Sequence, residues 1–207
     1  MSDDAIRFYF SFRSPYAWLA AEKLEAELGG LGVRIERLPT YPTPGLFPND
    51  PVALPNKVAH LVQDVSRLAR EAGLKLTFPA VDDVDWPLPH AAFLAAEERN
   101  AGHPFMLETF RKRWTEGRDL GDEGVLAEAA AAAGLDVAAL LEAARSEALQ
   151  AEAEAGFRRG IERDKIFGVP SFVYRGKLYW GQDRMHFVRS AVLRKSGGGS
   201  GREEPES

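Results

Sequence analysis

The sequence predicts an α/β fold, and three observations lead to that prediction. Residues 6–12 form a short, aromatic-rich apolar run that ends at a turn signal, which is typical of a buried strand. Residues 33–38 alternate apolar with charged side chains, which indicates a second strand with one exposed face. Residues 171–174 and 178–180 flank Gly176 and predict an antiparallel hairpin.

The first helix is expected directly after the first strand. Ser14 is the natural N-cap, and Pro15 suits the first helical position. Apolar side chains recur at helical spacing as far as Leu28, where two glycines end the helix. A strand, a helix and a strand in so short a span favour a right-handed parallel crossover.

A block of helices, at about residues 56–165, separates this half from the C-terminal hairpin. A proline-rich loop at 39–55 leads into the block, whose first helix, at 56–73, carries an apolar stripe. Further helices are expected at 91–101, 104–115, 123–133, 137–147 and 151–165, and a final one from 182 to about 194. The layout, βαβ followed by a helical insertion and ββα, is thioredoxin-like. We expect a single domain at 5–195 and a disordered, Gly- and Ser-rich tail at 196–207.

Composition excludes several classes of function. A formal net charge of −5 argues against a nucleic-acid-binding surface, and the short basic run at 111–113 fits a solvated helix face. The chain has no cysteine, so it carries no thiol nucleophile of its own, which fits a cytoplasmic protein. Residues 1–7 do not resemble a signal peptide, and no apolar run suits a membrane span. The four histidines lack metal-binding spacing, so no metal site is predicted.

Ser14 is the first candidate for chemistry. A group at the start of a helix faces unpaired N–H groups and the positive end of the helix dipole, so an anion held nearby is stabilised. A serine with no histidine base near it is a poor nucleophile. It is nevertheless a good hydrogen-bond donor, able to stabilise a thiolate that another molecule supplies. The alternative is that Ser14 is a plain N-cap.

Two further regions are candidates for binding. A cis peptide at Val169–Pro170 would leave the Val169 backbone free to pair with a peptide-like ligand. Because only a minority of X–Pro bonds are cis, a trans bond is the expectation from sequence. Gln182 and Asp183 are expected to open the last helix, either as a helix-start pair or as ligands of an amino-acid head group.

In their order and spacing these three regions resemble one family. The chain is similar to the 2-hydroxychromene-2-carboxylate isomerases and the related kappa-class glutathione transferases, which have a DsbA-like thioredoxin fold. The resemblance extends from Ile6 to Arg194. It is carried by the stretches FYFSFRSPYAWLA (8–20), LPNKVAHLVQDVSRLAR (54–70) and FGVPSFVYRGKLYWGQDRM (167–185).

The resemblance implies that glutathione is the cofactor. It implies that Ser14 hydrogen-bonds the glutathione sulfur and favours the thiolate. The backbone of Val169 would pair with the cysteinyl unit, and Gln182 and Asp183 would hold the γ-glutamyl end. Further cofactor contacts are implied for three residues at matching positions: Pro170, Asn49 and Lys57.

The implied activity is the cis–trans isomerisation of a small aromatic-degradation intermediate. A thiolate adds to the conjugated substrate, a bond rotates, and elimination returns glutathione unchanged. Tyr16, His60 and His90 are weaker candidates for the substrate end of the site. The chain differs from the family pattern at Ser11, at Ala17 and at both of these histidines, which are either proton carriers or structural and surface groups.

Two other functions are open at this point. A kappa-like transferase or peroxidase would use the same thiolate site but consume an electrophilic substrate. A non-catalytic thiol-binding protein would keep the fold without the chemistry. Members of the family are commonly dimers, so a homodimer is expected.

Overall fold

The computed structural model describes residues 4–41, 54–80 and 84–197 of the 207-residue chain. The described strands form one mixed sheet in the order β2-β1-β3-β4. β1 pairs in parallel with β2, and β3 pairs antiparallel with both β1 and β4. This topology confirms the predicted thioredoxin-like α/β fold. The strands are β1 (Ile6–Phe10), β2 (Ile35–Pro39), β3 (Ser171–Tyr174) and β4 (Lys177–Trp180).

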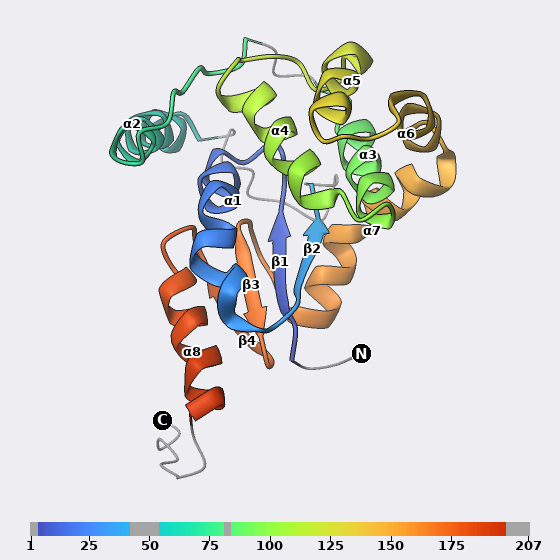
Figure 1. The fold of residues 1–207 in the computed structure, drawn as a ribbon. Coiled ribbons are helices and arrows are strands. Elements are labelled where there is room, and N and C mark those ends of the chain that lie inside the picture. Colours follow the sequence, from blue (N-terminus) through green and yellow to red (C-terminus); the bar gives the residue numbers. More distant parts are fainter. Residues whose placement is uncertain (1–3, 42–53, 81–83, 198–207) are drawn as a thin grey trace.

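Helices cover both faces of the sheet and gather at one end of it (Figure 1). α1 and α8 pack on one face, α7 packs on the other, and α3 to α6 lie together beyond the ends of β1 and β2. α2 stands to one side of the rest of the molecule. The helices are α1 (Pro15–Leu28), α2 (Pro55–Glu71), α3 (Pro87–Glu98), α4 (Gly102–Trp114), α5 (Glu123–Ala132), α6 (Val137–Ala144), α7 (Glu147–Asp164) and α8 (Met185–Gly197).

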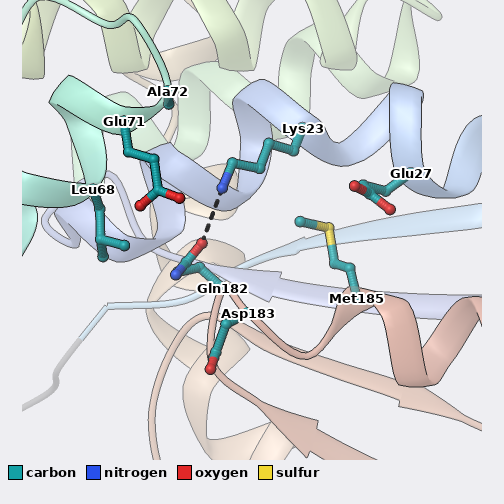
Figure 2. A pocket seen from close by; sticks show the side chains of 8 residues that line it. All are labelled: Lys23, Glu27, Leu68, Glu71, Ala72, Gln182, Asp183 and Met185. Carbon is teal, nitrogen blue, oxygen red and sulfur yellow. Dashed lines mark hydrogen bonds between the residues drawn. The ribbon is translucent and has the colours of Figure 1, made fainter.

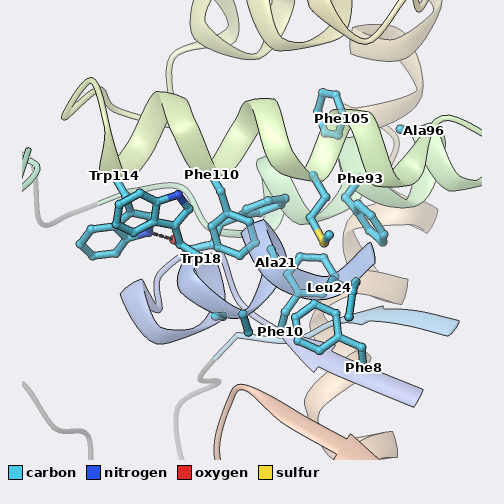
Figure 3. Close-up of a cluster of buried hydrophobic side chains, with 14 of the residues drawn as sticks. Phe8, Phe10, Trp18, Ala21, Leu24, Phe93, Ala96, Phe105, Phe110 and Trp114 are labelled. Atoms are coloured by element: carbon cyan, nitrogen blue, oxygen red, sulfur yellow. Dashed lines mark hydrogen bonds between the residues drawn. The ribbon is translucent and has the colours of Figure 1, made fainter. Parts of the chain in front are cut away.

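β1 is the centre of the core, and all five of its residues are buried. On the α1 side, Phe8 stacks on Phe172 of β3 at 4.9 Å between ring centroids, and Phe10 meets Phe93 of α3 edge-on, also at 4.9 Å. Figure 3 shows this aromatic cluster between α1 and α4. Trp114 of α4 donates a hydrogen bond of 3.0 Å to the carbonyl of Phe12. The core therefore holds the end of β1 and the turn that follows it.

On the opposite face, a buried ion pair joins β1 to α7. Arg7 donates to both carboxylate oxygens of Asp164, at 2.6 and 2.7 Å, and the hydroxyl of Tyr9 donates to the same carboxylate. The side chains of Arg7 and Asp164 are only 5% and 4% exposed. Burial alone would raise the pKa of Asp164, but the hydrogen bonds from Arg7 and Tyr9 hold that pKa below its ordinary value.

Several element boundaries differ from the sequence prediction. β1 ends at Phe10 instead of residue 12, because the chain turns there and the Ser14 N–H bonds the Ser11 carbonyl at 3.0 Å. α7 begins four residues early, because the Ser146 hydroxyl accepts the N–H of Leu149 at 3.3 Å as an N-cap.

The last helix also differs from the prediction. α8 begins at Met185, because the helical hydrogen bonds begin at the carbonyl of Arg184. Gln182 and Asp183 therefore lie in a turn before the helix and do not open it. α8 continues to Gly197, two residues into the predicted tail, whose other residues lie outside the described part of the chain. Within the described residues, no helix is long and apolar enough to cross a membrane.

Candidate functional site

The sheet register brings the three predicted site regions to one end of the sheet. Tyr9 of β1 is paired with Ser171 of β3, which is paired with Trp180 of β4. Because β3 is antiparallel to both neighbours, the segments that follow β1, precede β3 and follow β4 lie at the same end. Those segments carry Ser14, Val169–Pro170 and Gln182–Asp183.

Ser14 is the N-cap of α1, as predicted. Its hydroxyl oxygen accepts the N–H of Ala17 at 3.2 Å, and its backbone is extended, at φ −98° and ψ 116°. No residue in the described part of the chain accepts the proton of this hydroxyl. Ser14 is half-buried at the N-terminus of a 14-residue helix. The hydroxyl can therefore donate to an anion where the helix dipole also favours negative charge.

The Val169–Pro170 peptide bond is cis, so the trans expectation was wrong. Pro170 is buried, and its carbonyl accepts the N–H of Gly181 at 2.9 Å. The same hydrogen bond joins this segment to the turn that carries Gln182. Among the described residues, none hydrogen-bonds to the N–H or C=O of Val169.

Gln182 and Asp183 line a cavity of about 460 Å³ between α1, the C-terminal end of α2 and the turn before α8. Figure 2 shows Lys23 of α1 reaching towards Gln182, and its ammonium donates to the Gln182 amide oxygen at 3.4 Å. The carboxylate of Asp183 instead forms an ion pair with Arg184. Eight residues line the cavity: Lys23, Glu27, Leu68, Glu71, Ala72, Gln182, Asp183 and Met185.

The remaining candidates on α1 and α2 lie at the interface of these helices or on the surface. The hydroxyl of Tyr16 donates to Asp64 of α2 at 2.8 Å, and burial together with this carboxylate raises the pKa of Tyr16. Lys57 and His60 are exposed on the first turns of α2. Asn49 lies outside the described residues.

His90 of α3 is completely buried beneath the turn that follows β1. Its Nδ1 lies 2.7 Å from the carbonyl of Trp86, which can only accept, so Nδ1 carries the proton. Nε2 is then the acceptor, 3.4 Å from both the Ser11 hydroxyl and the Phe12 N–H. Burial lowers the pKa of His90 to about 4. A neutral, enclosed imidazole fits the structural alternative better than a proton carrier.

Comparison with known proteins places the chain in a family. The model of the DsbA-like thioredoxin domain matches residues 5–193. The chain belongs to this family. A 2-hydroxychromene-2-carboxylate isomerase from Sphingobium xenophagum is 31% identical over 195 residues, which are 91% of this chain and 97% of that protein. A protein of the same name from Pseudomonas putida is 27% identical, over 91% of this chain and 94% of its own length.

A solved structure of a protein with the same name has the same fold as this chain. The structure of a 2-hydroxychromene-2-carboxylate isomerase superposes with a TM-score of 0.78 and 25% identity, covering 93% of this chain and 96% of that one. Within the DsbA-like fold, this chain has a serine as the N-cap of α1 and no cysteine anywhere. It therefore has no thiol with which to exchange disulfides.

Of the charged residues that line the cavity, only Asp183 was predicted from the sequence as a binding residue. Lys23, Glu27 and Glu71 occupy positions in helices where a charged side chain normally faces solvent. The only signal available was that Lys23 and Glu27 are four residues apart and so share one face of α1. Their common location becomes clear only when α1, α2 and the 182–185 turn are placed together.

Proposed function

We propose that this protein is an isomerase of the 2-hydroxychromene-2-carboxylate type that uses glutathione as its cofactor. One observation carries the proposal: no described residue accepts the hydroxyl proton of Ser14 at the N-terminus of α1, and none pairs with the Val169 backbone at the same end of the sheet. Relatives that bear this enzyme's name match the chain over nearly its whole length, which supports the choice of reaction.

The residues present suit a peptide-like thiol. The N–H and C=O of Val169 can pair with an extended peptide in the manner of an added strand. Ser14 offers a hydrogen-bond donor to a sulfur held beside it. The cavity at Gln182 offers polar groups of both donor and acceptor type, and its volume of about 460 Å³ lies within the usual range for small-molecule sites.

In this mechanism the chain supplies no nucleophile of its own. Bound glutathione would supply a thiolate that adds reversibly to a conjugated substrate and leaves unchanged. The Ser14 hydroxyl would donate a hydrogen bond to the sulfur and so favour the ionised thiolate. The dipole of α1 acts in the same direction. A hydrogen bond to a charged acceptor contributes about 1.5–3 kcal/mol, which corresponds to a pKa lowered by about one to two units.

The test is the substitution Ser14→Ala. We expect the pKa of the bound glutathione thiol, followed by thiolate absorbance, to rise by about one to two units. The rate of isomerisation near neutral pH should fall about 10- to 100-fold. Ser14→Thr, which keeps a hydroxyl and a good N-cap, serves as the matched control. An Ala variant that keeps both the thiol pKa and the full rate would show that Ser14 has no such role.

Product analysis distinguishes the isomerase from a kappa-like transferase. An isomerase rearranges the substrate and leaves the glutathione concentration unchanged, whereas a transferase accumulates a glutathione conjugate. Mass spectrometry of the reaction mixture measures both. Accumulation of the conjugate at the rate of substrate loss would replace the isomerase proposal with the transferase.

A further inference from the structure

The turn at residues 11–14 connects Ser14 to the helical insertion through a single peptide group. The N–H of that group belongs to Phe12 and donates to Nε2 of His90 on α3 at 3.4 Å. Its carbonyl belongs to Ser11 and accepts the N–H of Ser14 at 3.0 Å. Because a peptide group is planar and rigid, a rotation that moves its N–H away from His90 also moves the carbonyl to which Ser14 is bonded.

The next peptide group of the turn is held in the same way from α4. Its carbonyl, that of Phe12, accepts the indole N–H of Trp114 at 3.0 Å. Its N–H, that of Arg13, donates to the Ser11 hydroxyl at 3.3 Å. Each of these two consecutive peptide groups is therefore bonded at one end within the turn and at the other end to a side chain of the insertion.

The two insertion side chains are themselves fixed by their neighbours. The imidazole of His90 is completely buried, and its Nδ1 donates to the Trp86 carbonyl at 2.7 Å. The guanidinium carbon of Arg113 lies 5.4 Å from the ring centroid of Trp86 and 5.9 Å from that of Trp114, which suits a cation–π contact with both rings. These contacts join α3 to α4 beside the turn, and a change of rotamer at His90 or Trp114 would break them.

We propose that His90 and Trp114 are positioning residues, which set the direction of the Ser14 hydroxyl by fixing the two peptide groups that precede it. This inference rests on the proposed function. Both side chains are buried, so they act on the thiol through Ser14. A hydroxyl donor stabilises a negative charge only when its O–H is aimed at that charge. The helical insertion therefore controls how strongly Ser14 favours the thiolate.

The pKa of the bound glutathione thiol, followed by thiolate absorbance, tests the inference. Trp114→Phe removes the indole donor and keeps an aromatic ring, and His90→Met removes the acceptor. We expect each to raise the thiol pKa by about half a unit to one unit, because the hydrogen bond from Ser14 is weakened. His90→Gln, which keeps an acceptor near the position of Nε2, should restore the thiol pKa. The affinity for S-methylglutathione, which has no ionisable thiol, should not change.

Two substitutions of the same kinds serve as matched controls. Trp18→Phe removes an indole donor that is bonded to Glu22 within α1. His103→Met removes a histidine of α4 whose Nδ1 has no hydrogen-bond partner among the described residues. Neither side chain is bonded to the turn, so the thiol pKa should stay at the wild-type value in both controls.

The same substitution in the Ser14→Ala background separates positioning from a general structural role. If Trp114 acts through Ser14, Trp114→Phe should raise the thiol pKa no further once the hydroxyl is absent. An equal rise in both backgrounds would show that Trp114 acts independently of Ser14 and would overturn the inference. A parallel loss of S-methylglutathione binding would overturn it too, because the two side chains would then only satisfy buried backbone groups of the core.

The outcomes also distinguish this inference from the proposed function. If Ser14→Ala raises the thiol pKa and neither Trp114→Phe nor His90→Met does so, the positioning role fails and the proposed function stands. Trp114→Phe, the milder change, decides alone if His90→Met does not fold. If Ser14→Ala leaves the thiol pKa unchanged, or if the wild-type protein binds no glutathione at millimolar concentration, the proposed function fails and this inference fails with it.

Discussion

His90 supports the turn that carries Ser14. Its protonated Nδ1 is bound to the Trp86 carbonyl at 2.7 Å, so its other nitrogen faces the Phe12 N–H as an acceptor. A charged imidazole would have donors on both nitrogens and could no longer accept there. Because the ring is completely buried, the neutral form is strongly favoured in the folded protein.

The pH dependence of the free energy of unfolding should show that His90 is neutral in the folded protein. The pKa of His90 falls to about 4 on folding from an ordinary value of 6.5, so between these values the unfolded chain binds a proton that the folded chain does not. The free energy of unfolding should therefore decrease as the pH falls from 6.5 to 4, by up to about 1.4 kcal/mol per pH unit from this residue. His90→Asn should reduce that slope in urea denaturation at pH 4.5, 5.5 and 6.5.

The control for this experiment is His186→Asn, on the exposed part of α8. The free energy of unfolding of His186→Asn, measured at the same pH values, shows how much the loss of an exposed histidine changes the slope. Parallel profiles for the wild-type protein and His90→Asn would mean that His90 does not titrate as its burial implies.

Among the elements, α2 is attached to the body of the protein by few contacts. Of its predicted apolar stripe only Val65 and Ala69 are fully buried, and Val62 is 39% exposed. The hydrogen bond from Tyr16 to Asp64 is a direct polar connection between α1 and α2. This helix is therefore expected to open more easily than the helices packed on the sheet.

Tyr16→Phe should loosen α2 selectively. The substitution removes a single hydrogen bond and keeps the ring, which costs about 1 kcal/mol. Amide hydrogen exchange should become faster across 55–71 and remain unchanged in β1 and β3. Ser66→Ala, which removes only a hydroxyl bonded within α2, is the control. Uniform acceleration through the whole chain, or none at all, would contradict the assigned role of Tyr16.

For the whole molecule, the buried pair of Arg7 and Asp164 connects the first strand of the sheet to the end of the helical insertion. These residues are 157 positions apart in the chain, so the contact forms only when the insertion has returned to the sheet. Tyr9 completes the set of hydrogen bonds to the carboxylate. Removal of one partner leaves a buried charge without compensation.

Asp164→Asn should lower the free energy of unfolding by about 3–5 kcal/mol, since Arg7 would keep its charge and lose its counterion. Glu123→Gln removes one partner of the exposed pair with Arg145, which has similar bidentate geometry, and should lower the free energy of unfolding far less, because solvent screens both charges. Denaturant unfolding at neutral pH measures both. Similar losses from the two substitutions would show that burial does not determine the strength of the Arg7 pair.

The sequence predicted those features that depend on neighbouring residues. Ser14 was identified as an N-cap because serine before proline has the local chemistry of a helix start, and the hydrogen bond to Ala17 confirms it. The isomer of Val169–Pro170 and the turn at Gln182 were not predicted correctly. Both segments are joined by the hydrogen bond between Gly181 and Pro170, which lies beside the paired strands β3 and β4 and is not a local feature of the sequence.

The charged cavity could not be predicted either, because it forms only when α1, α2 and the turn before α8 come together in the fold. Lys23 and Glu71 each have the pattern of a solvated helix position, and nothing in the order of the residues indicates that they face one space. Helical periodicity identifies the exposed side of one helix. It does not say which exposed sides the fold will bring together.

The position of α2 has a consequence for how ligand preference can change over evolution. One wall of the cavity, formed by Leu68, Glu71 and Ala72, belongs to a helix that neither contains Ser14 nor contributes to the sheet. Mutations in that single segment can alter the shape and charge of the wall while leaving the helix start at Ser14 and the Val169–Pro170 segment before β3 intact. Under the proposed function, binding preference and reactivity are thus encoded in separate stretches of the chain and can drift independently. A library restricted to the cavity side of α2 would explore new ligands without disturbing the core.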